Sequence, residues 1–359
     1  MNKVVSIHYL RGIAALLVVS YHNKTSGYEG LDKQNIFEYL FKGGAFGVDL
    51  FFIISGFIIA YSTQESTKNN LLSFNLKRLF RIYPILLVAL TLYIFINPVY
   101  SPEEILRSYF FINRDYSKSA PFFGYNVLFP AWSLSYEVYF YFIFASAMGI
   151  CHRYRILLAS LFLIIPPLAL QFYFNSEISL NGNMQLQNVK FSALSFFASP
   201  MMFEFVVGMV IFCMMNSFKN IKHSKLISST LLFSFLICYF TTFHFSVGLN
   251  GFGAWAILLI VSALIFEKNY GFKGNIILKF LGDISYSLYL AHAIVMQAFI
   301  KYHNYIPFYE KNSPLKFLVI LFTSIFAAWI LHIIIEKPML KLGRLTLNKT
   351  LTFKKQDFL

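Results

Sequence analysis

The stretch VVSIHYLRGIAALLVVSYH, from Val4 to His22, is decisive for the fold of this chain. It is long enough for one helix to cross a bilayer, yet it contains His8, Arg11 and His22. A charged side chain at bilayer depth is costly, so it indicates a polar interior cavity and a functional site. The alternative is an arginine that only pairs with a neighbouring helix, flanked by interfacial histidines.

Arg11 and His22 lie on the same face of this predicted helix, because their separation corresponds to about three full turns at about 100° per residue. At about 1.5 Å per residue they are roughly 16 Å apart along the axis. Ala15 and Val18 fall between them on that face. The pattern therefore leaves space for a slender ligand beside the helix.

The composition indicates a polytopic membrane protein. Hydrophobic residues make up 57% of the 359 positions and charged residues 13%, with a mean hydropathy of +0.61, whereas a soluble domain carries about 25% charged residues. The net charge of +14 comes from Lys and Arg spread over short loops, a pattern of membrane topology rather than of nucleic-acid binding. The first apolar run is too long for the core of a cleavable signal peptide. Cys151, Cys213 and Cys238 show no metal or redox spacing, so no disulfide framework is expected.

Apolar runs of about 17 to 24 residues predict about ten transmembrane helices in an all-α, polytopic bundle. The predicted spans are 4–22, 44–63, 79–99, 130–150, 155–174, 192–215, 225–243, 249–267, 284–300 and 315–335. Pro166, Pro167 and Pro200 are expected to kink or interrupt the fifth and sixth spans. We expect a single transmembrane domain, residues 1–345, followed by a basic cytoplasmic tail, residues 346–359.

The distribution of Lys and Arg predicts the orientation of the spans. With the N-terminus inside, nineteen of these residues fall in cytoplasmic segments and ten in outer ones. The outer ten are Lys24, Lys33, Lys42, Arg107, Arg114, Lys118, Lys190, Lys301, Lys311 and Lys316. Both termini are therefore expected to be cytoplasmic, as an even number of spans requires.

This topology assigns similar depths to three polar residues from separate spans. His22 ends the first helix at the outer side, and both Asp49 and Glu137 lie in the outer part of inward-running helices. A carboxylate that orients a histidine and stabilises its charged form is a common acid–base arrangement. The sequence therefore predicts an outer acid–base level, with the alternative that Asp49 caps its helix or holds an arginine.

A second polar group is predicted at the cytoplasmic side. Arg78 and Arg81 stand one turn apart in KRLFRIYP, where the third span is expected to begin. Arginine forks match phosphate geometry, and a helix N-terminus would add a favourable field for an anion. These residues predict a phosphate-binding mouth, although they could instead contact lipid headgroups. A long, thin, phosphorylated donor would fit the distance between the two levels.

Several further polar or aromatic residues are candidates for substrate contacts or for packing. His292 lies near the middle of its span, where it is either a ligand or a satisfied core histidine. Tyr136, Tyr286 and Tyr289 are packing residues with hydrogen-bonded hydroxyls unless they face a substrate. Zinc-protease, P-loop, nucleophile-elbow and paired CxxC motifs are absent from the sequence, which argues against a metal site and against soluble-type NTPase chemistry.

Six short motifs in order resemble the acyltransferase-3 family of bacterial integral membrane acyltransferases, and the resemblance extends from Ile7 to Pro338. The motifs are LRGIAALLVVSYH with Arg11 and His22, GVDLFFIISGFI (47–58), RLFRIYP (78–84), WSLSYE with Trp132, Ser135, Tyr136 and Glu137, SYSLYLAH (285–292) and EKP (336–338). The lysine of EKP stands where many relatives have arginine, and it keeps the charge.

The resemblance implies a transfer of acyl groups, usually acetyl from acetyl-CoA, to hydroxyls of cell-surface sugars. His22 would be the catalytic histidine, either as general base or as a transient acyl carrier, with Arg11 as its motif partner. Arg78 and Arg81 would hold the CoA phosphates, and Glu137 would orient His22 or help to move protons. No permanently bound cofactor is implied, because acyl-CoA acts as a co-substrate.

The expected location is the inner (plasma) membrane, with a surface or lipid-linked saccharide as acceptor. Some relatives carry an additional extracytoplasmic SGNH hydrolase-like domain, so we expect this chain to act alone or with a separate transferase partner. The competing interpretation is a transporter or flippase for a glycolipid or small solute, with Arg11, Asp49 and Glu137 as the binding or proton-relay set.

Overall fold

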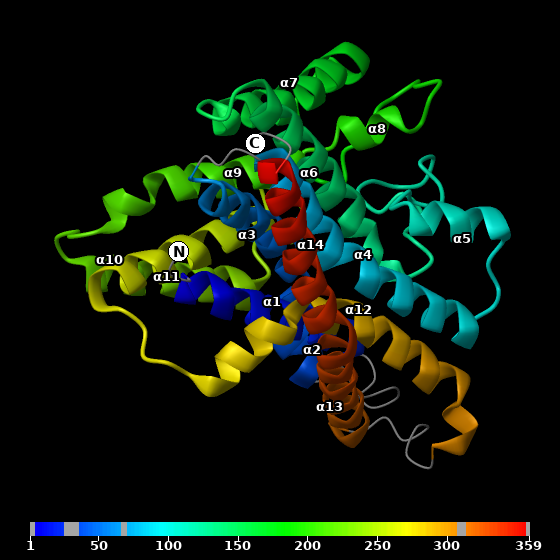
Figure 1. Ribbon diagram of the computed structural model, residues 1–359. Coiled ribbons are helices and arrows are strands. Elements are labelled where there is room, and N and C mark those ends of the chain that lie inside the picture. The colour runs from blue at the N-terminus through cyan, green and yellow to red at the C-terminus, as the bar shows by residue number, and fades with distance from the viewer. Residues whose placement is uncertain (1–3, 25–35, 66–69, 307–313, 357–359) are drawn as a thin grey trace.

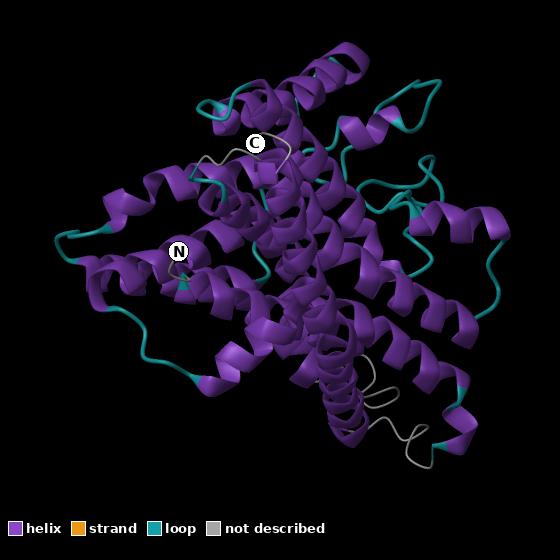
Figure 2. Ribbon diagram, in the orientation of Figure 1, coloured by secondary structure: helices purple, strands orange, loops and turns teal. Residues whose placement is uncertain are grey.

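The computed structural model of the chain describes residues 4–24, 36–65, 70–306 and 314–356, and within these ranges it is a bundle of helices without a β-strand (Figures 1 and 2). This confirms the predicted all-α fold. The helices are α1 (Val5–Asn23), α2 (Ile36–Phe41), α3 (Gly47–Ser62), α4 (Asn70–Ile96), α5 (Pro102–Tyr109), α6 (Trp132–Ile150), α7 (Arg155–Asn175), α8 (Leu194–Phe197), α9 (Met202–Met214), α10 (Ser224–Thr241), α11 (Phe252–Tyr270), α12 (Ile276–Lys301), α13 (Pro314–Leu331) and α14 (Lys337–Gln356).

Seven helical segments in the described ranges are long and apolar enough to cross a membrane. They are Ile36–Ser62, Leu71–Ile96, Arg155–Asn175, Leu194–Phe218, Ser224–Thr241, Phe252–Tyr270 and Pro314–Asn348. Every one of the ten predicted spans overlaps a helix, but α1, α6 and α12 are not among the seven. These three helices carry Arg11, Glu137 and His292, so polar side chains lower their hydropathy. The predicted number of ten spans stays a prediction.

The structure changes one predicted boundary and contains one predicted interruption. The sequence predicts that the third span begins beside Arg78, but α4 begins at Asn70, and Phe74 near its start packs against Tyr141 and Phe144. Arg78 and Arg81 therefore lie well inside α4, and the expected field of a helix N-terminus does not reach them, since it fades within the first turn. The sixth predicted span is interrupted before Met202, as Pro200 led us to expect.

The helix α1 is held at its N-terminus by a side chain from another helix. The Glu267 carboxylate at the end of α11 accepts hydrogen bonds from the Val5 N–H (2.8 Å), the Ser6 N–H (2.9 Å) and the Ser6 hydroxyl. The first N–H groups of a helix have no partner within it, so Glu267 replaces a local cap. One turn further, His8 Nε2 lies 3.1 Å from Asp283 Oδ1 of α12. These contacts fix α1 between α11 and α12.

Glycines permit the closest helix contacts in the bundle. A Cβ at Gly12 would lie 2.6 Å from the Gly282 N, so α1 and α12 meet backbone to backbone. Likewise, Cβ atoms at Gly56 and Gly208 would collide with the carbonyl oxygens of Phe205 and Ile53, respectively, where α3 crosses α9. Small residues are the usual means of close helix approach in membranes. This packing brings α1, α3 and α12 to the centre of the molecule.

The last helices form one long rod through a π-helical turn, His332–Glu336, between α13 and α14 (Figure 1). The predicted boundary at residue 345 falls inside α14, which continues to Gln356 and packs against α4 at the contact of Gly343 with Phe80. Residues 357–359 of the expected tail lie outside the described residues, as do Lys33 and Lys311 of the orientation argument.

Candidate active site

Three cavities follow one another through the bundle, and neighbouring cavities share wall residues. We name them the basic cavity (450 Å³), the central cavity (50 Å³) and the histidine cavity (230 Å³). Ile58, Arg78 and Arg81 line both the basic and the central cavity. Val48 and Tyr289 line both the central and the histidine cavity. The three cavities are therefore neighbours, and the smallest lies between the two larger ones.

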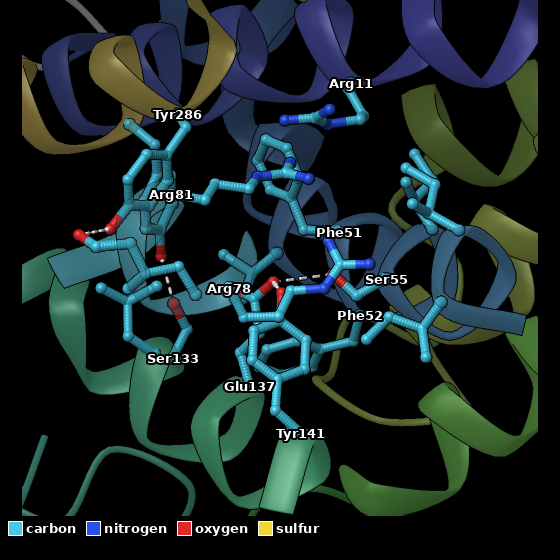
Figure 3. A pocket seen from close by; sticks show the side chains of 17 residues that line it. Arg11, Phe51, Phe52, Ser55, Arg78, Arg81, Ser133, Glu137, Tyr141 and Tyr286 are labelled. Carbon is cyan, nitrogen blue, oxygen red and sulfur yellow. Dashed lines mark hydrogen bonds between the residues drawn. The ribbon is translucent and has the colours of Figure 1, made fainter. Parts of the chain in front are cut away.

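The central cavity gathers three arginines and one carboxylate. Figure 3 shows Arg11 reaching into it from α1, and Arg78 and Arg81 from α4, with Glu137 of α6 on the far wall. Arg11 lies within electrostatic reach of Arg81, Glu137 and Glu336. Three cations around one carboxylate leave an excess of positive charge, which favours an anionic ligand.

Glu137 is fixed by two hydroxyl donors. Its Oε1 accepts a hydrogen bond from Ser55 Oγ (3.1 Å) and another from the Tyr141 hydroxyl, as Figure 3 shows. Glu137 lines the central cavity, whereas His22 lines the histidine cavity. The structure thus brings Glu137 to the arginines and not to the histidine.

Arg78 lies between the basic and the central cavity and lines both of them. One terminal nitrogen donates to Ser62 Oγ (3.1 Å), and the guanidinium carbon lies 5.5 Å from the ring centroids of both Phe74 and Tyr141. Its Nε–H is buried and has no acceptor among the described residues. A buried donor without a partner is costly, so this atom is available for an anionic ligand. Lys77 lines the same basic cavity.

The histidine cavity contains His22 in a defined tautomer. His22 Nδ1 lies 2.9 Å from the Val18 carbonyl oxygen, which can only accept, so Nδ1 carries the proton. The lone pair is therefore on Nε2, and His22 is half-buried at the cavity wall. A neutral imidazole with a free Nε2 can take a proton or attack an acyl carbon.

His292 of α12 supports the ring of His22. The two ring centroids are 5.2 Å apart with planes inclined by 27°, and Phe129 meets both rings edge-on. His292 is fully buried, and its Nε2 has no hydrogen-bond partner among the described residues. The sequence placed His292 in the middle of its span, but only the fold shows that it stacks on His22.

Aromatic side chains line most of the remaining histidine cavity. They are Tyr21, Phe122, Tyr125, Trp132, Phe245, Phe252 and Tyr289, together with the polar Asn183 and Ser246. The Tyr289 hydroxyl is held by Ser133 Oγ (2.8 Å) and by the Pro130 carbonyl oxygen (2.9 Å). Besides His22, the predicted candidates Trp132 and Tyr289 line this cavity. Its flat apolar faces and few polar groups suit a cyclic ligand.

Other predicted candidates have hydrogen bonds that hold loops and helices. Ser135 Oγ donates to the Phe111 carbonyl oxygen (2.5 Å), and the Tyr136 hydroxyl donates to the Pro121 carbonyl oxygen (3.1 Å), which ties the loop between α5 and α6 to α6. The Tyr286 hydroxyl donates to the Ile82 carbonyl oxygen (3.0 Å) while its ring lines the central cavity.

Asp49 does not join His22 in the structure. It is fully buried, its Oδ1 accepts from the Gly248 N–H (2.8 Å), and it faces Glu204 of α9. The structure therefore does not bring His22, Asp49 and Glu137 together as the predicted outer level. Each of the three helices directs its residue toward a different neighbour. Sequence reasoning missed Glu204, although a carboxylate in an apolar run is a signal that could have found it.

Glu336 forms a second buried group that the sequence did not assign. Its Oε2 accepts from Ser287 Oγ (2.8 Å) and lies 2.7 Å from His332 Nδ1. The π-helical turn between His332 and Glu336 brings both side chains to α12. No group of three or more His, Cys, Asp or Glu in the described part of the chain could hold a metal ion.

Comparison with known proteins gives a family and named relatives. Residues 4–333 match the family model described as "Acyltransferase domain". The chain is 25% identical over 311 residues to "Exopolysaccharide production protein ExoZ" of Rhizobium meliloti (strain 1021), an alignment of 84% of this chain and 91% of that protein.

A second relative is longer than this chain. "Putative O-acetyltransferase SACOL0978" of Staphylococcus aureus (strain COL) is 27% identical over an alignment of 382 positions, with 97% of this chain covered. The chain spans 59% of that relative's length. No solved structure matches the chain.

Proposed function

The chain belongs to the acyltransferase family whose model it matches, and on that premise we propose that it transfers an acyl group, in particular acetyl, from cytoplasmic acyl-CoA to a saccharide hydroxyl. The observation that carries this proposal is the row of three adjacent cavities between the arginines and His22. Its wide ends suit a large donor head and a cyclic acceptor, and its narrow middle suits a thin connecting arm.

The donor would enter through the basic cavity. Lys77, Arg78 and Arg81 supply the cations that bind phosphates, and the unpaired Nε–H of Arg78 supports this fit. The central cavity, at 50 Å³, has room for a few water-sized groups and not for a nucleotide. The nucleotide would therefore remain in the basic cavity, while the thioester arm passes Arg11 toward His22.

His22 would activate the acceptor as a general base. Its Nε2 takes the proton of the acceptor hydroxyl while the hydroxyl oxygen bonds to the thioester carbon. The carbon–sulfur bond then breaks, and the imidazolium of His22 returns the proton to the sulfur, so that CoA leaves as the thiol. The hydrogen bond from Nδ1–H to the Val18 carbonyl supports the required tautomer. His22 as a transient acyl carrier remains the second chemistry, with Nε2 itself forming the bond to the acyl carbon.

The acceptor would occupy the histidine cavity. Its aromatic faces can pack against the apolar C–H face of a sugar, while Asn183 and Ser246 can pair with hydroxyls. The name of the Rhizobium relative refers to exopolysaccharide production and that of the Staphylococcus relative to O-acetyl transfer. These names support a cell-surface or lipid-linked saccharide as the acceptor.

We further propose about ten transmembrane helices in the inner (plasma) membrane, with both termini cytoplasmic. This topology places the basic cavity at the source of acyl-CoA and the histidine cavity at the outer side, and it follows the excess of Lys and Arg in the inner segments. A separate transferase partner would be required only if His22 passes the acyl group to another protein.

A transporter or flippase is the second candidate, because the same row of cavities could carry a solute. The two functions are separated by His22→Asn, which keeps a side-chain N–H donor for the Val18 carbonyl and removes Nε2. The matched control is His223→Asn, at an exposed histidine with φ 59°, a backbone conformation that asparagine tolerates.

The test measures base-labile acyl esters on surface polysaccharide by NMR, in a deletion strain complemented with each variant. The proposed function requires esters with the parent chain and with His223→Asn, and their loss with His22→Asn at equal membrane abundance. Equal ester content in all strains, combined with altered polysaccharide export, would instead establish the transporter.

A further inference from the structure

Two buried carboxyl groups face each other beside the histidine cavity without a cation. Asp49 lies in the first turn of α3 and Glu204 in the first turn of α9, and both side chains are completely inaccessible to solvent. Each is the nearest electrostatic neighbour of the other. No ion pair involves either residue in the ranges that the structure describes. Nothing in the proposed transfer reaction uses this pair.

The hydrogen-bond donors around the pair are too few for two ionised carboxylates. Asp49 Oδ1 accepts from the Gly248 N–H at 2.8 Å. Asp49 Oδ2 and both oxygens of Glu204 are buried and have no hydrogen-bond donor among the described residues. Two adjacent buried carboxylates repel each other, so one of them retains its proton. That proton supplies the missing donor between the two groups.

We propose that Asp49 and Glu204 share one proton, and that Asp49 thereby holds the loop between α10 and α11 against the histidine cavity, where the acceptor would bind. We call this pair of residues the latch. The loop segment Phe245–Val247 lines the histidine cavity, and Gly248, directly after it, is the residue that Asp49 binds. The latch deepens the proposed function, since its effect on acceptor binding depends on that function. The shared proton and the loop anchor do not depend on it.

The backbone around Gly248 makes this anchor specific. Gly248 has φ +101°, and a Cβ there would lie 2.6 Å from both the Gly182 N and the Leu180 carbonyl oxygen. On the opposite side of the loop, the Gly182 N–H donates to the Val247 carbonyl oxygen (2.8 Å). The loop is therefore held by hydrogen bonds to Asp49 on one side and to Gly182 on the other. Loss of the Asp49 contact removes one of these two restraints.

The far side of the pair is also closed. A Cβ at Gly253, in the first turn of α11, would lie 2.8 Å from Glu204 Oε1, so only glycine fits there. Asp49 and Glu204 therefore join α3 and α9 to the start of α11 through one buried proton. They are positioning residues, because they act through the loop and line none of the three cavities.

The first test measures the solvent accessibility of the loop and does not require enzymatic activity. Ser246→Cys is introduced into a chain whose three native cysteines are replaced by serine, and the purified protein in detergent is treated with a small soluble maleimide. The variants compared are Asp49→Ala, Asp49→Asn and Glu204→Gln. Asparagine and glutamine each keep an N–H donor for the remaining carboxylate and preserve the net charge of the pair.

We expect Asp49→Ala to raise the alkylation rate of the thiol introduced by Ser246→Cys at least fivefold, and the two amide variants to stay within about twofold of their parent. An unchanged rate in Asp49→Ala would overturn the anchor. Loss of folding in both amide variants would overturn the shared proton, since an amide N–H should replace the O–H of a carboxylic acid as the donor between the two groups. If Asp49→Ala does not fold, Gly248→Ala tests the same anchor, because its added Cβ would collide with the Gly182 N and the Leu180 carbonyl oxygen. It should raise the alkylation rate in the same way.

The second test connects the latch to the acceptor. With a soluble saccharide acceptor, Asp49→Ala should raise the acceptor KM at least fivefold at an unchanged donor KM, and Asp49→Asn should restore it. A fall in kcat alone would contradict a positioning role. If no variant or parent shows transfer while the alkylation pattern holds, the proposed function fails and the latch stands.

Discussion

His22 of α1 and His292 of α12 stack with ring centroids 5.2 Å apart and planes inclined by 27°. The contact joins the half-buried histidine of the cavity to a fully buried one. Two imidazolium ions at this distance are unfavourable, because their positive charges would repel each other. In the proposed reaction the pair would supply one base, His22, and the ring of His292 would orient it.

Replacement of His292 tests this relationship. His292→Phe keeps a planar ring against His22, and we expect its rate of acyl transfer to remain within about threefold of the parent. His292→Ala removes the ring, and we expect a rate at least tenfold lower, which corresponds to about 1.4 kcal/mol in the barrier. The measurement is kcat in purified protein. Equal losses in the two variants would show that an imidazole nitrogen, rather than the ring face, is required.

Arg78 should control donor affinity. A charge-assisted hydrogen bond contributes about 1.5–3 kcal/mol, so Arg78→Ala should raise the KM for acyl-CoA by roughly tenfold to a hundredfold. Arg78→Lys should recover only part of this loss, because it lacks the guanidinium fork. Arg153→Ala, at an exposed arginine outside the three cavities, is the matched control. A KM that rises equally in the control would point to bulk charge instead.

The crossing of α3 and α9 should not tolerate a methyl group. Gly208→Ala places a Cβ against the Ile53 carbonyl oxygen, and we expect it to destabilise the fold by about 1–3 kcal/mol. Gly274→Ala has no atom within 4 Å of the added Cβ, so its thermal midpoint in detergent should equal that of the parent. The same midpoint for both variants would contradict the close contact.

The cross-helix cap of α1 should contribute measurably to stability. Glu267→Ala leaves the N–H groups of Val5 and Ser6 without their acceptor, and we expect a loss of about 0.5–2 kcal/mol. Glu267→Gln keeps one carbonyl acceptor and should recover part of it. Unfolding of the purified protein in mixed micelles measures both. An alanine variant as stable as the parent would show that water replaces the cap.

The loop between α5 and α6 contains an acid-sensitive turn at Asp115. The Ser117 hydroxyl and N–H donate to its Oδ1 and hold the pKa of this carboxyl below its ordinary value. A lowered pKa in the folded state means that the turn is stabilised at neutral pH and loses this contribution only as the pH falls below about 4. Proteolysis of the loop should accelerate in that range. In Ser117→Ala, we expect faster proteolysis already at neutral pH.

The sequence by itself determined the class of fold and the family. Apolar runs of this length favour helices, and all ten predicted spans overlap a helix of the structure. The spacing of Arg11 and His22 also predicted two levels on one helix face, and these residues do line different cavities of the row. Helical periodicity is local, so it can be read without knowledge of the neighbours.

Only the tertiary structure decided which polar residues meet. The sequence predicts one depth for Asp49, Glu137 and His22, yet Asp49 faces Glu204, Glu137 binds Ser55, and His22 stacks on His292. Depth along a helix follows from residue counting, whereas the rotation of each helix about its axis is set by packing against its neighbours, here by contacts such as Gly12 with Gly282. For this reason the partners of a buried polar group cannot be read from one segment alone.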